Sequence, residues 1–371
     1  MQGRFCGDYW LARHADRRLN LSLRTIGASE AAADLAGFDA VIDARSPAEF
    51  EEDHLPGAIN WPVLDNEQRR IVGLLYVQTS ALEARKLGAA MAARNIADHL
   101  DRWMADKPRE WQPLVYCWRG GQRSGALAWF LEQIGFRTAK LAGGYKGFRA
   151  VVRQDLEAWP SRYQFKILAG RTGSGKTRLL QVLAAQGAQV LDLEGLAVHR
   201  GSILGGLPGQ PQPSQKAFDN RLWQALRVLD VNRPVFVESE SKKIGRLQLP
   251  DALITHMHAQ GQVLQIQMPD AARVQLLLED YGFFAADVAH FCKLLDGLIA
   301  LRGRDTVGRW QALAQAGQWA EAFSQMMQAH YDPLYNRSMD RHYNGLADAR
   351  LVPLADGTPA VLHAAARTLL G

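Results

Sequence analysis

The stretch Pro113-Leu-Val-Tyr-Cys-Trp-Arg-Gly-Gly-Gln-Arg-Ser124 decides the fold of the first half of this chain. Its apolar start is typical of a short buried strand, and residues 125–131 that follow it are typical of a helix. Cys117 stands between them on a glycine-rich turn. Backbone N–H groups of such a loop and of the helix N-terminus converge on one point, where they bind an anion. Thiols at such positions ionise readily, so the loop predicts a nucleophilic cysteine that handles a small anionic group.

Short apolar strands alternate with helices on both sides of this loop. Strands are predicted at 38–43, 114–116 and 138–141. Helices are predicted at 47–51, with Ser46 as the cap, and at 81–104 and 124–134. Strands that alternate with helices are typical of a parallel α/β sheet.

A second anion-binding loop follows at Gly170-Arg-Thr-Gly-Ser-Gly-Lys-Thr177, which fits the pattern G-x-x-x-x-G-K-[ST] in full. It stands between a predicted strand, 165–169, and a predicted helix, 178–185, which is the context of a phosphate-binding loop. The glycines let the backbone wrap a diphosphate. Lys176 supplies positive charge to the phosphate oxygens, and Thr177 can hold Mg²⁺.

The sequence after this loop predicts further strands and then helices. Strands are expected at 188–192, 234–238 and 263–268, a Gly- and Pro-rich loop at 201–213, and mostly helices from about residue 271. Asp192 and Glu238 end two of these strands, and either could be the outer carboxylate of a metal site.

Composition restricts the class of protein. The chain has 371 residues, 47% of them hydrophobic and 22% charged, as in an ordinary soluble protein of two or three domains. No apolar run is long enough to span a membrane, and the N-terminus lacks a secretory signal. Cys6, Cys117 and Cys292 are far apart and odd in number, so they form no disulfide framework or zinc site, and we expect a cytoplasmic protein.

Positive charge is concentrated in the middle of the chain. Residues 137–250 hold 18 Lys and Arg against 8 Asp and Glu, whereas the whole chain has a net charge of +5. Such a basic segment favours a polyanionic partner such as nucleic acid, although some of these charges could serve phosphate in the loops or be solvated.

The residues of the first loop leave two kinds of chemistry open. The spacing of Cys117 and Arg123 suits a sulfurtransferase, and it also suits a cysteine phosphatase, in which thiolate attacks phosphorus and arginine holds its oxygens. Tyr116 stands where the common phosphatase signature has His. A purely structural cysteine is not expected in a loop so rich in glycine and arginine.

Four segments resemble a rhodanese domain: Asp43-Ala-Arg-Ser-Pro-Ala-Glu-Phe50, His54-Leu-Pro-Gly-Ala-Ile-Asn60, Tyr116–Ser124 and Leu141-Ala-Gly-Gly-Tyr145. Asp53 stands where rhodanese-like sequences commonly have Gly. Three further segments resemble the tRNA 2-selenouridine synthase family, in which a rhodanese domain is fused to a phosphate-loop domain: 190–202, 207–216 and 236–246. The resemblance covers roughly residues 35–270, weakens over the C-terminal helices and is absent from residues 1–24.

This resemblance implies a selenotransferase that also has tRNA geranyltransferase activity. Such enzymes replace the sulfur of 2-thiouridine at the tRNA wobble position with selenium from selenophosphate, and S-geranylation with geranyl diphosphate is the intermediate step. The expected partner is the anticodon region of tRNA. Selenophosphate and geranyl diphosphate are expected as substrates, Mg²⁺ is possible, and neither a tightly bound cofactor nor a membrane is expected.

The expected organisation combines two α/β domains. They are a rhodanese-like parallel-sheet domain and a phosphate-loop NTPase-like domain with a helical C-terminal region. The boundaries are an N-terminal arm at 1–24, the rhodanese-like domain at 25–150, a linker at 151–162, the phosphate-loop domain at 163–270 and the helical region at 271–371.

Site residues follow from the two loops and the resemblance. Cys117 is the expected nucleophile and would carry a perselenide, with Arg119 and Arg123 holding the anion. The rest of the anion loop is Trp118, Gly120, Gly121, Gln122 and Ser124. The phosphate-binding residues are Gly170, Thr172, Gly173, Ser174, Gly175, Lys176 and Thr177. Candidates for substrate or tRNA contact are His199, Arg200, Ser202, Gln215, Lys216, Glu238, Ser239, Lys242, Lys243 and Arg246.

Two other functions remain open. One is a phosphate-loop nucleotide kinase or ATPase with a rhodanese regulatory domain. The other is an RNA-binding module with an inactive rhodanese fold. The intact Cys117 loop disfavours this alternative, because inactive copies often lose the nucleophile.

Overall fold

The structure, a computed structural model, describes residues 23–343, 346 and 348–371. The arm predicted at 1–24 and Cys6 therefore lie outside the described residues, apart from Leu23 and Arg24. The chain divides after Val151 into two compact units. The division falls inside helix α6 (Gly144–Ala158), so the predicted linker begins as helix.

The first unit is built on a five-stranded, fully parallel sheet with the strand order β1-β5-β4-β2-β3. The predicted rhodanese-like parallel sheet is confirmed. Its strands are β1 (Arg24–Ile26), β2 (Ala40–Asp43), β3 (Ala58–Asn60), β4 (Pro113–Tyr116) and β5 (Ala139–Leu141). The sequence analysis did not predict β1 and β3, which are only three residues long and half exposed.

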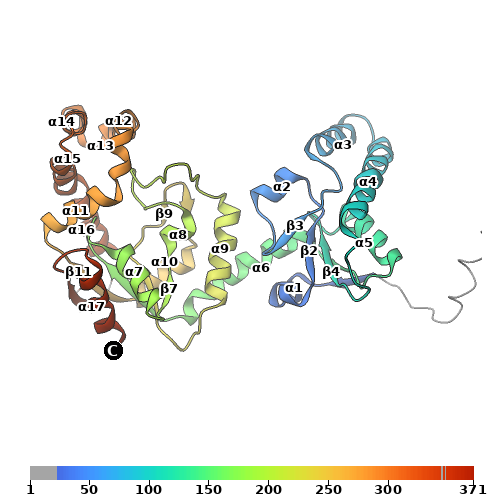
Figure 1. Ribbon diagram of the computed structural model, residues 1–371, viewed down its shortest axis with the longest axis horizontal. Coiled ribbons are helices and arrows are strands. Elements are labelled where there is room, and N and C mark those ends of the chain that lie inside the picture. The colour runs from blue at the N-terminus through green and yellow to red at the C-terminus, as the bar shows by residue number, and fades with distance from the viewer. Residues whose placement is uncertain (1–22, 344–345, 347) are drawn as a thin grey trace, which may run out of the picture. The chain divides into compact units, whose positions relative to one another are not determined.

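Helices cover both faces of this sheet. Helices α3 and α4 lie side by side on one face with α5, and α1 lies on the other (Figure 1). Their bounds are α1 (Ala28–Ala33), η1 (Leu35–Gly37), α2 (Pro47–Glu52), α3 (Asn66–Gln78), α4 (Ala81–Trp103) and α5 (Gln122–Ile134). Ser46 is the N-cap of α2 as predicted, and it forms a capping box with Glu49, whose carboxylate accepts the Ser46 backbone N–H at 3.2 Å.

The second unit contains another five-stranded parallel sheet, with the order β12-β11-β6-β8-β7. Its strands are β6 (Phe165–Ala169), β7 (Gln189–Leu191), β8 (Val235–Glu238), β11 (Gln262–Gln267) and β12 (Arg350–Pro353), and a small hairpin joins β9 (Lys243–Ile244) to β10 (Leu247–Gln248). Strand β12 lies within the C-terminal region that was predicted to be helical. Its only sequence signal is one short apolar pair, so its pairing with β11 had to be seen in the structure.

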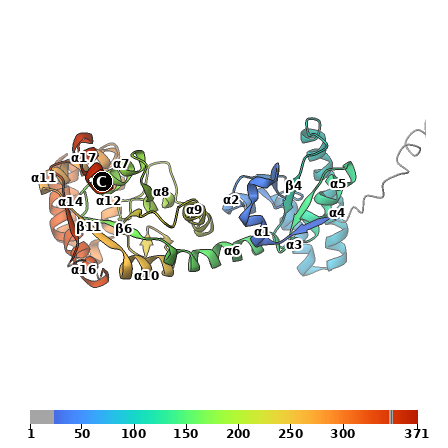
Figure 2. The same cartoon turned by 90° about the horizontal axis from the view of Figure 1, so that it is seen from below.

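Helices enclose this second sheet on both faces. In Figure 2, α7 and α17 lie on one side of β6 and β11, and α10 and α16 lie on the other. The bounds are η2 (Pro160–Arg162), α7 (Lys176–Ala185), α8 (Leu193–Ala197), α9 (Gln215–Arg227), α10 (Asp251–Gln260), α11 (Asp270–Asp280), η3 (Gly282–Ala286), α12 (Val288–Asp296), α13 (Ile299–Arg302), α14 (Arg304–Gln315), α15 (Trp319–Met326), η4 (Met327–Tyr331), α16 (Asp332–His342) and α17 (Pro359–Leu370).

Two hydrophobic clusters among the described residues contribute to the core of the second unit. One packs α7 against α17 over the sheet, with Leu180, Leu183 and Leu362 at its centre. The other joins α11, α12, α14 and α15 around the buried side chains of Phe291 and Trp310. No helix among the described residues is both long and apolar enough to cross a membrane.

Candidate functional site

Cys117 lies directly after β4, buried at the start of the loop that leads into α5. The Ser124 hydroxyl, in the first turn of α5, donates a hydrogen bond to the Cys117 sulfur at 3.1 Å. A hydroxyl donor and a helix N-terminus both favour negative charge on this atom. The strand, loop and helix predicted around Cys117 are therefore present, with the sulfur facing the start of the helix.

The backbone around Cys117 is clamped by the segment that follows β5. Tyr145 and Lys146 donate their backbone N–H groups to the carbonyls of Cys117 and Trp118 at 2.8 and 2.9 Å. Any side chain at Gly144 would collide with the Cys117 carbonyl, and Gly120 has a φ of 67°. Glycine is required at both positions, because one needs close backbone approach and the other a left-handed conformation.

The two arginines of the loop have different surroundings. Arg119 is exposed at the tip of the loop. Arg123 is half-buried and donates to Glu49 at 2.6 Å. Burial opposes ionisation of Glu49, but the hydrogen bond and charge of Arg123 hold the pKa of Glu49 below its usual value. To bind an anion held by the loop, the Arg123 guanidinium must therefore either break its ion pair with Glu49 or keep that pair and use its remaining N–H groups.

A buried ionic network beneath the loop was missed by the sequence analysis. Arg45 pairs with Asp43 at 2.6 Å and donates to the Asp53 carbonyl at 2.6 Å, and Tyr145 donates to the Asp53 carboxylate at 2.8 Å. Asp43 lies opposite Tyr116 in the sheet, beside the Cys117 loop. Asp53, which departs from the rhodanese pattern, is thus a buried hydrogen-bond partner of Tyr145, the residue whose backbone N–H holds the Cys117 carbonyl. The sequence analysis had quoted these residues within or beside the rhodanese-like segments but had given them no role.

The phosphate loop connects β6 to α7, as predicted. Gly173 and Gly175 have φ values of 78° and 79°, which only glycine adopts without strain. Lys176 folds back and donates to the Gly170 carbonyl at 2.6 Å. Its ammonium also lies 5.5 Å from the ring centre of Tyr335, on α16.

Helices α11 and α16 support this loop from far along the chain. The Gly170 N–H donates to the Tyr335 hydroxyl at 2.6 Å. The buried Arg273 donates twice to the Thr172 carbonyl, at 2.8 and 2.9 Å, and pairs with Asp332 at 2.5 Å. Nothing in the sequence pattern pointed to these residues, because about a hundred or more positions separate them from the loop.

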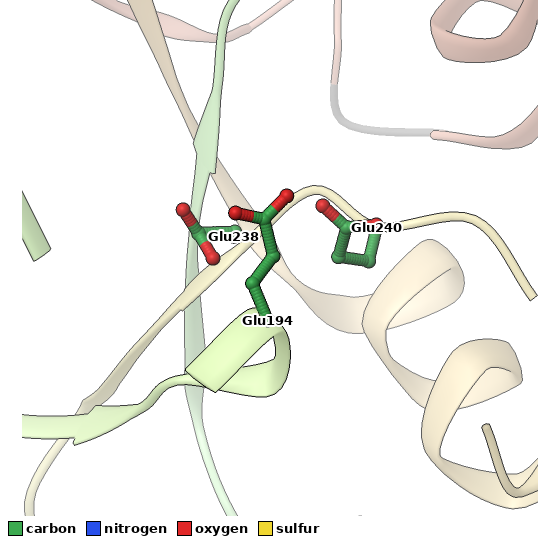
Figure 3. A group of neighbouring side chains, drawn as sticks. All are labelled: Glu194, Glu238 and Glu240. Atoms are coloured by element: carbon green, nitrogen blue, oxygen red, sulfur yellow. The ribbon is translucent and has the colours of Figure 1, made fainter. Parts of the chain in front are cut away.

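Three glutamates gather beside Thr177 (Figure 3). One carboxyl oxygen from each of Glu194, Glu238 and Glu240 lies within 4.8 Å of the other two. The Thr177 hydroxyl donates to Glu238 at 2.5 Å and lies 3.3 Å from Glu194. The second oxygen of Glu238 is buried and has no hydrogen-bond partner among the described residues.

Electrostatics of this cluster favour a bound cation. Burial, followed by repulsion between the carboxylates, raises the pKa of Glu194 and Glu238 to about 8 and that of Glu240 to about 7. A hydroxyl and carboxylate oxygens are ligands that Mg²⁺ prefers. Of the two predicted metal carboxylates, Glu238 lies here. Asp192 instead accepts the Gly195 N–H at 2.7 Å and caps α8.

The remaining candidates lie on several segments of the second unit. The Ser239 hydroxyl lies 3.2 Å from that of Tyr335. His199, Arg200 and Ser202 follow α8. Burial lowers the pKa of His199, and Arg200 donates to the Asp280 carbonyl.

The other candidates lie around α9 and the hairpin β9–β10. Gln215 bonds Asp219 and the Gln248 carbonyl, Lys216 is half-buried on α9, Lys242 pairs with Asp251, Lys243 is exposed, and Arg246 donates to the Gln212 carbonyl. Of this candidate group, Glu238 contacts Thr177 of the phosphate loop directly, and Ser239 is linked to Gly170 of the loop through the Tyr335 hydroxyl.

Comparison with known proteins follows the two-unit division. A family described as "Rhodanese-like domain" matches residues 27–151, and one described as "tRNA 2-selenouridine synthase AAA domain" matches residues 163–297. The tRNA 2-selenouridine synthase of Shewanella halifaxensis is 31% identical over an alignment 353 residues long, which covers 86% of this chain and 94% of that protein. The chain belongs to the tRNA 2-selenouridine synthase family.

Other members of the tRNA 2-selenouridine synthase family align over less of their length. The Nitrosomonas europaea protein of that name is 37% identical over 245 residues, 65% of this chain and 63% of that protein. The chain thus spans under two thirds of the length of this relative. Among solved structures, a rhodanese-related protein from Thermoplasma volcanium matches 34% of this chain and 92% of its own, with 20% identity and a TM-score of 0.23.

Most of the site residues lie within the two regions that match known families, but two of them do not. Cys117 lies within the rhodanese match, and Gly170–Thr177 with all three glutamates lies within the synthase-domain match. Asp332 and Tyr335 lie outside both matched regions, yet they contact the phosphate loop or its anchor directly. Helix α16 therefore helps to hold the Gly170–Thr177 loop in place.

Proposed function

We propose that this chain replaces the sulfur of wobble 2-thiouridine in tRNA with selenium from selenophosphate, after S-geranylation with geranyl diphosphate. The observation that supports it most is the presence, in one chain of this family, of a cysteine in an anion loop and a complete phosphate loop. The basic segment 137–250 supports a tRNA partner. An activity on tRNA would operate in the cytoplasm.

The phosphate loop would bind the diphosphate of the geranyl donor. The thiouridine sulfur attacks the first carbon of the geranyl chain, the carbon–oxygen bond breaks, and diphosphate leaves. Lys176 and the loop N–H groups would stabilise the charge that develops on that leaving group. Thr177 and the glutamate cluster fit Mg²⁺, which would neutralise the diphosphate further when bound.

Alkylation prepares the sulfur for departure. Selenium adds to C2 of the modified base, the carbon–sulfur bond breaks, and geranylthiol leaves. With selenophosphate and one water as reactants, the products are 2-selenouridine, geranylthiol and phosphate, so the exchange involves no oxidation or reduction.

Cys117 could serve this exchange in two ways. With phosphate as the other product, a perselenide on Cys117 would require a two-electron oxidation of the selenium that selenophosphate supplies, and hence an added oxidant. Attack of the thiolate on phosphorus would instead release hydrogen selenide and leave S-phosphocysteine, which water cleaves to phosphate. The Cys117–Arg123 spacing suits this redox-neutral course. Mass spectrometry of enzyme quenched during turnover separates the two, since one adduct contains selenium and the other phosphorus.

The test of the whole function separates the two half-reactions. Purified Lys176→Ala is expected to lose geranylation of a thiouridine anticodon stem-loop by at least about a hundredfold, but to selenate a geranylated one. Cys117→Ala is expected to do the reverse. Full selenation by Cys117→Ala would remove Cys117 from the mechanism. Rapid ATP or GTP hydrolysis stimulated by a small acceptor, without geranyl diphosphate binding, would favour the kinase or ATPase alternative.

A further inference from the structure

A cavity of about 530 Å³ lies in the first unit, between α3, α4 and the first turn of α5. Its volume falls within the range of about 300–1,000 Å³ that small-molecule sites occupy. Neither the sequence motifs nor the proposed reaction has given this cavity a role so far.

Small residues on one face of α4 create the cavity. Ala84, Gly88, Ala89 and Ala92 all line it, and their spacing places them along one side of the helix. Val72 of α3 faces them, and a methyl group at Gly88 would lie 3.3 Å from a Val72 methyl carbon. The helices therefore touch at Gly88 and leave apolar space beside this contact, which suits an aliphatic ligand.

Cationic side chains lie around this apolar space. Arg69, Arg85 and Arg123 contribute to its lining. Glu49 balances part of this charge, because it lies 2.6 Å from Arg123 and 4.0 Å from Arg69. An aliphatic wall with arginines at its border suits an apolar chain that is attached to an anionic molecule.

The cavity and the cysteine loop share one turn of helix. Gln122 and Arg123, which begin α5, line the cavity. The next residue, Ser124, donates to the Cys117 sulfur. A group bound in the cavity would therefore lie against the first turn of α5, whose Ser124 hydroxyl contacts the Cys117 sulfur.

We propose that this cavity binds the isoprenoid chain of S-geranylated tRNA, with the arginines facing the RNA phosphates, during the exchange at Cys117. The proposal rests on the proposed function, because that function supplies the geranylated RNA. In the exchange, the carbon–selenium bond forms at C2, the carbon–sulfur bond breaks, and the geranylthiolate takes up a proton. The cavity would hold the chain of this leaving group.

The test fills the cavity without touching the catalytic loop. Ala89→Met adds a flexible side chain at an exposed position of the cavity wall, and Ala90→Met adds the same side chain to the neighbouring exposed residue, which does not line the cavity. Affinities of the full-length protein are measured for anticodon stem-loops that carry S-geranyl- or S-methyl-2-thiouridine. The wild type and Ala90→Met are expected to prefer the geranyl RNA by about tenfold. Ala89→Met is expected to bind both RNAs equally.

The outcomes separate this proposal from the proposed function. An equal affinity of the wild type for both RNAs, or a preference that Ala89→Met retains, would overturn the cavity assignment. If the wild type prefers geranyl RNA and Ala89→Met does not, the assignment stands even when no selenation is detected, and only the proposed function fails.

A second variant guards against a folding defect in the first. Val72→Ala enlarges the cavity opposite Gly88, so it is expected to improve the binding of an S-farnesyl stem-loop relative to the geranyl one by at least threefold. A misfolded domain cannot produce such a gain. An unchanged or lower farnesyl preference in this variant would count against the cavity as the chain's site.

Discussion

Asp332→Ala tests whether the C-terminal helices hold the phosphate loop in place. Arg273 is 1% exposed, and its guanidinium lies 2.5 Å from the Asp332 carboxylate and 2.8 Å from the Thr172 carbonyl. Removing one partner of a buried ion pair costs about 3–5 kcal/mol, because the remaining charge is left without compensation. Asp270, 2.9 Å from Arg273, retains part of the attraction. We therefore expect a loss of about 2–3 kcal/mol.

Thermal unfolding of the full-length protein measures this loss. For a unit of about 200 residues, the expected change is a fall of about 5–10 °C in the unfolding temperature. Asp270→Ala is the matched control, because the Asp270 side chain is 56% exposed and exposed pairs contribute about 1 kcal/mol or less. The same Asp332→Ala variant should bind geranyl diphosphate more weakly, since Arg273 would no longer fix the Thr172 carbonyl. A fall no larger than that of Asp270→Ala would refute the reasoning.

Two further predictions concern the two sites separately. Ser124→Ala removes the hydroxyl that donates to the Cys117 sulfur. Alkylation of Cys117 by iodoacetamide at pH 7 should therefore slow by roughly tenfold. An unchanged rate would show that this hydrogen bond does not activate the thiol. The pKa of Glu238 is raised to about 8 by burial and neighbouring carboxylates, so the folded state holds a proton there that the unfolded state loses near pH 4.5. Without metal, stability should fall as the pH rises from about 5 to 8, and Glu238→Gln should flatten this fall. Mg²⁺ should raise the unfolding temperature more at pH 8.5 than at pH 6, and an equal effect at both would contradict the cation site.

The pattern of neighbouring residues was enough to predict the position of the two loops and of the strand and helix on either side of each. The Cys117 loop and the phosphate loop each require a strand, glycines at defined positions and a helix start, all within about fifteen consecutive residues. The predicted strands and helices around both loops are present, with ends that differ by a few residues. Resemblance to a family supplied the expected chemistry, and the family itself is now established by the Shewanella halifaxensis relative.

Contacts between distant segments could not be predicted in the same way. Glu194 stands on α8 and Glu240 follows β8, and only the pairing of β7 with β8 brings these segments together. In the sequence, strand β12 shows only two neighbouring apolar residues, which is too weak a pattern to predict a strand. Its pairing with β11 is what makes it one. The cavity of the first unit depends on the packing of α3 against α4, because small residues leave space only where the opposing helix does not fill it.

The sequence by itself determined where the two glycine-rich loops lie, each between a strand and a helix. That information is local, since backbone conformation over a few residues is set by glycine, capping and side-chain pattern. The tertiary structure decided what surrounds each loop. Asp53 and Tyr145 lie beneath Cys117, and Tyr335, Arg273 and Glu194 converge on Gly170–Thr177. Burial, charge repulsion and ion pairing depend on distances in space, and residues far apart in the sequence come this close only when the chain folds.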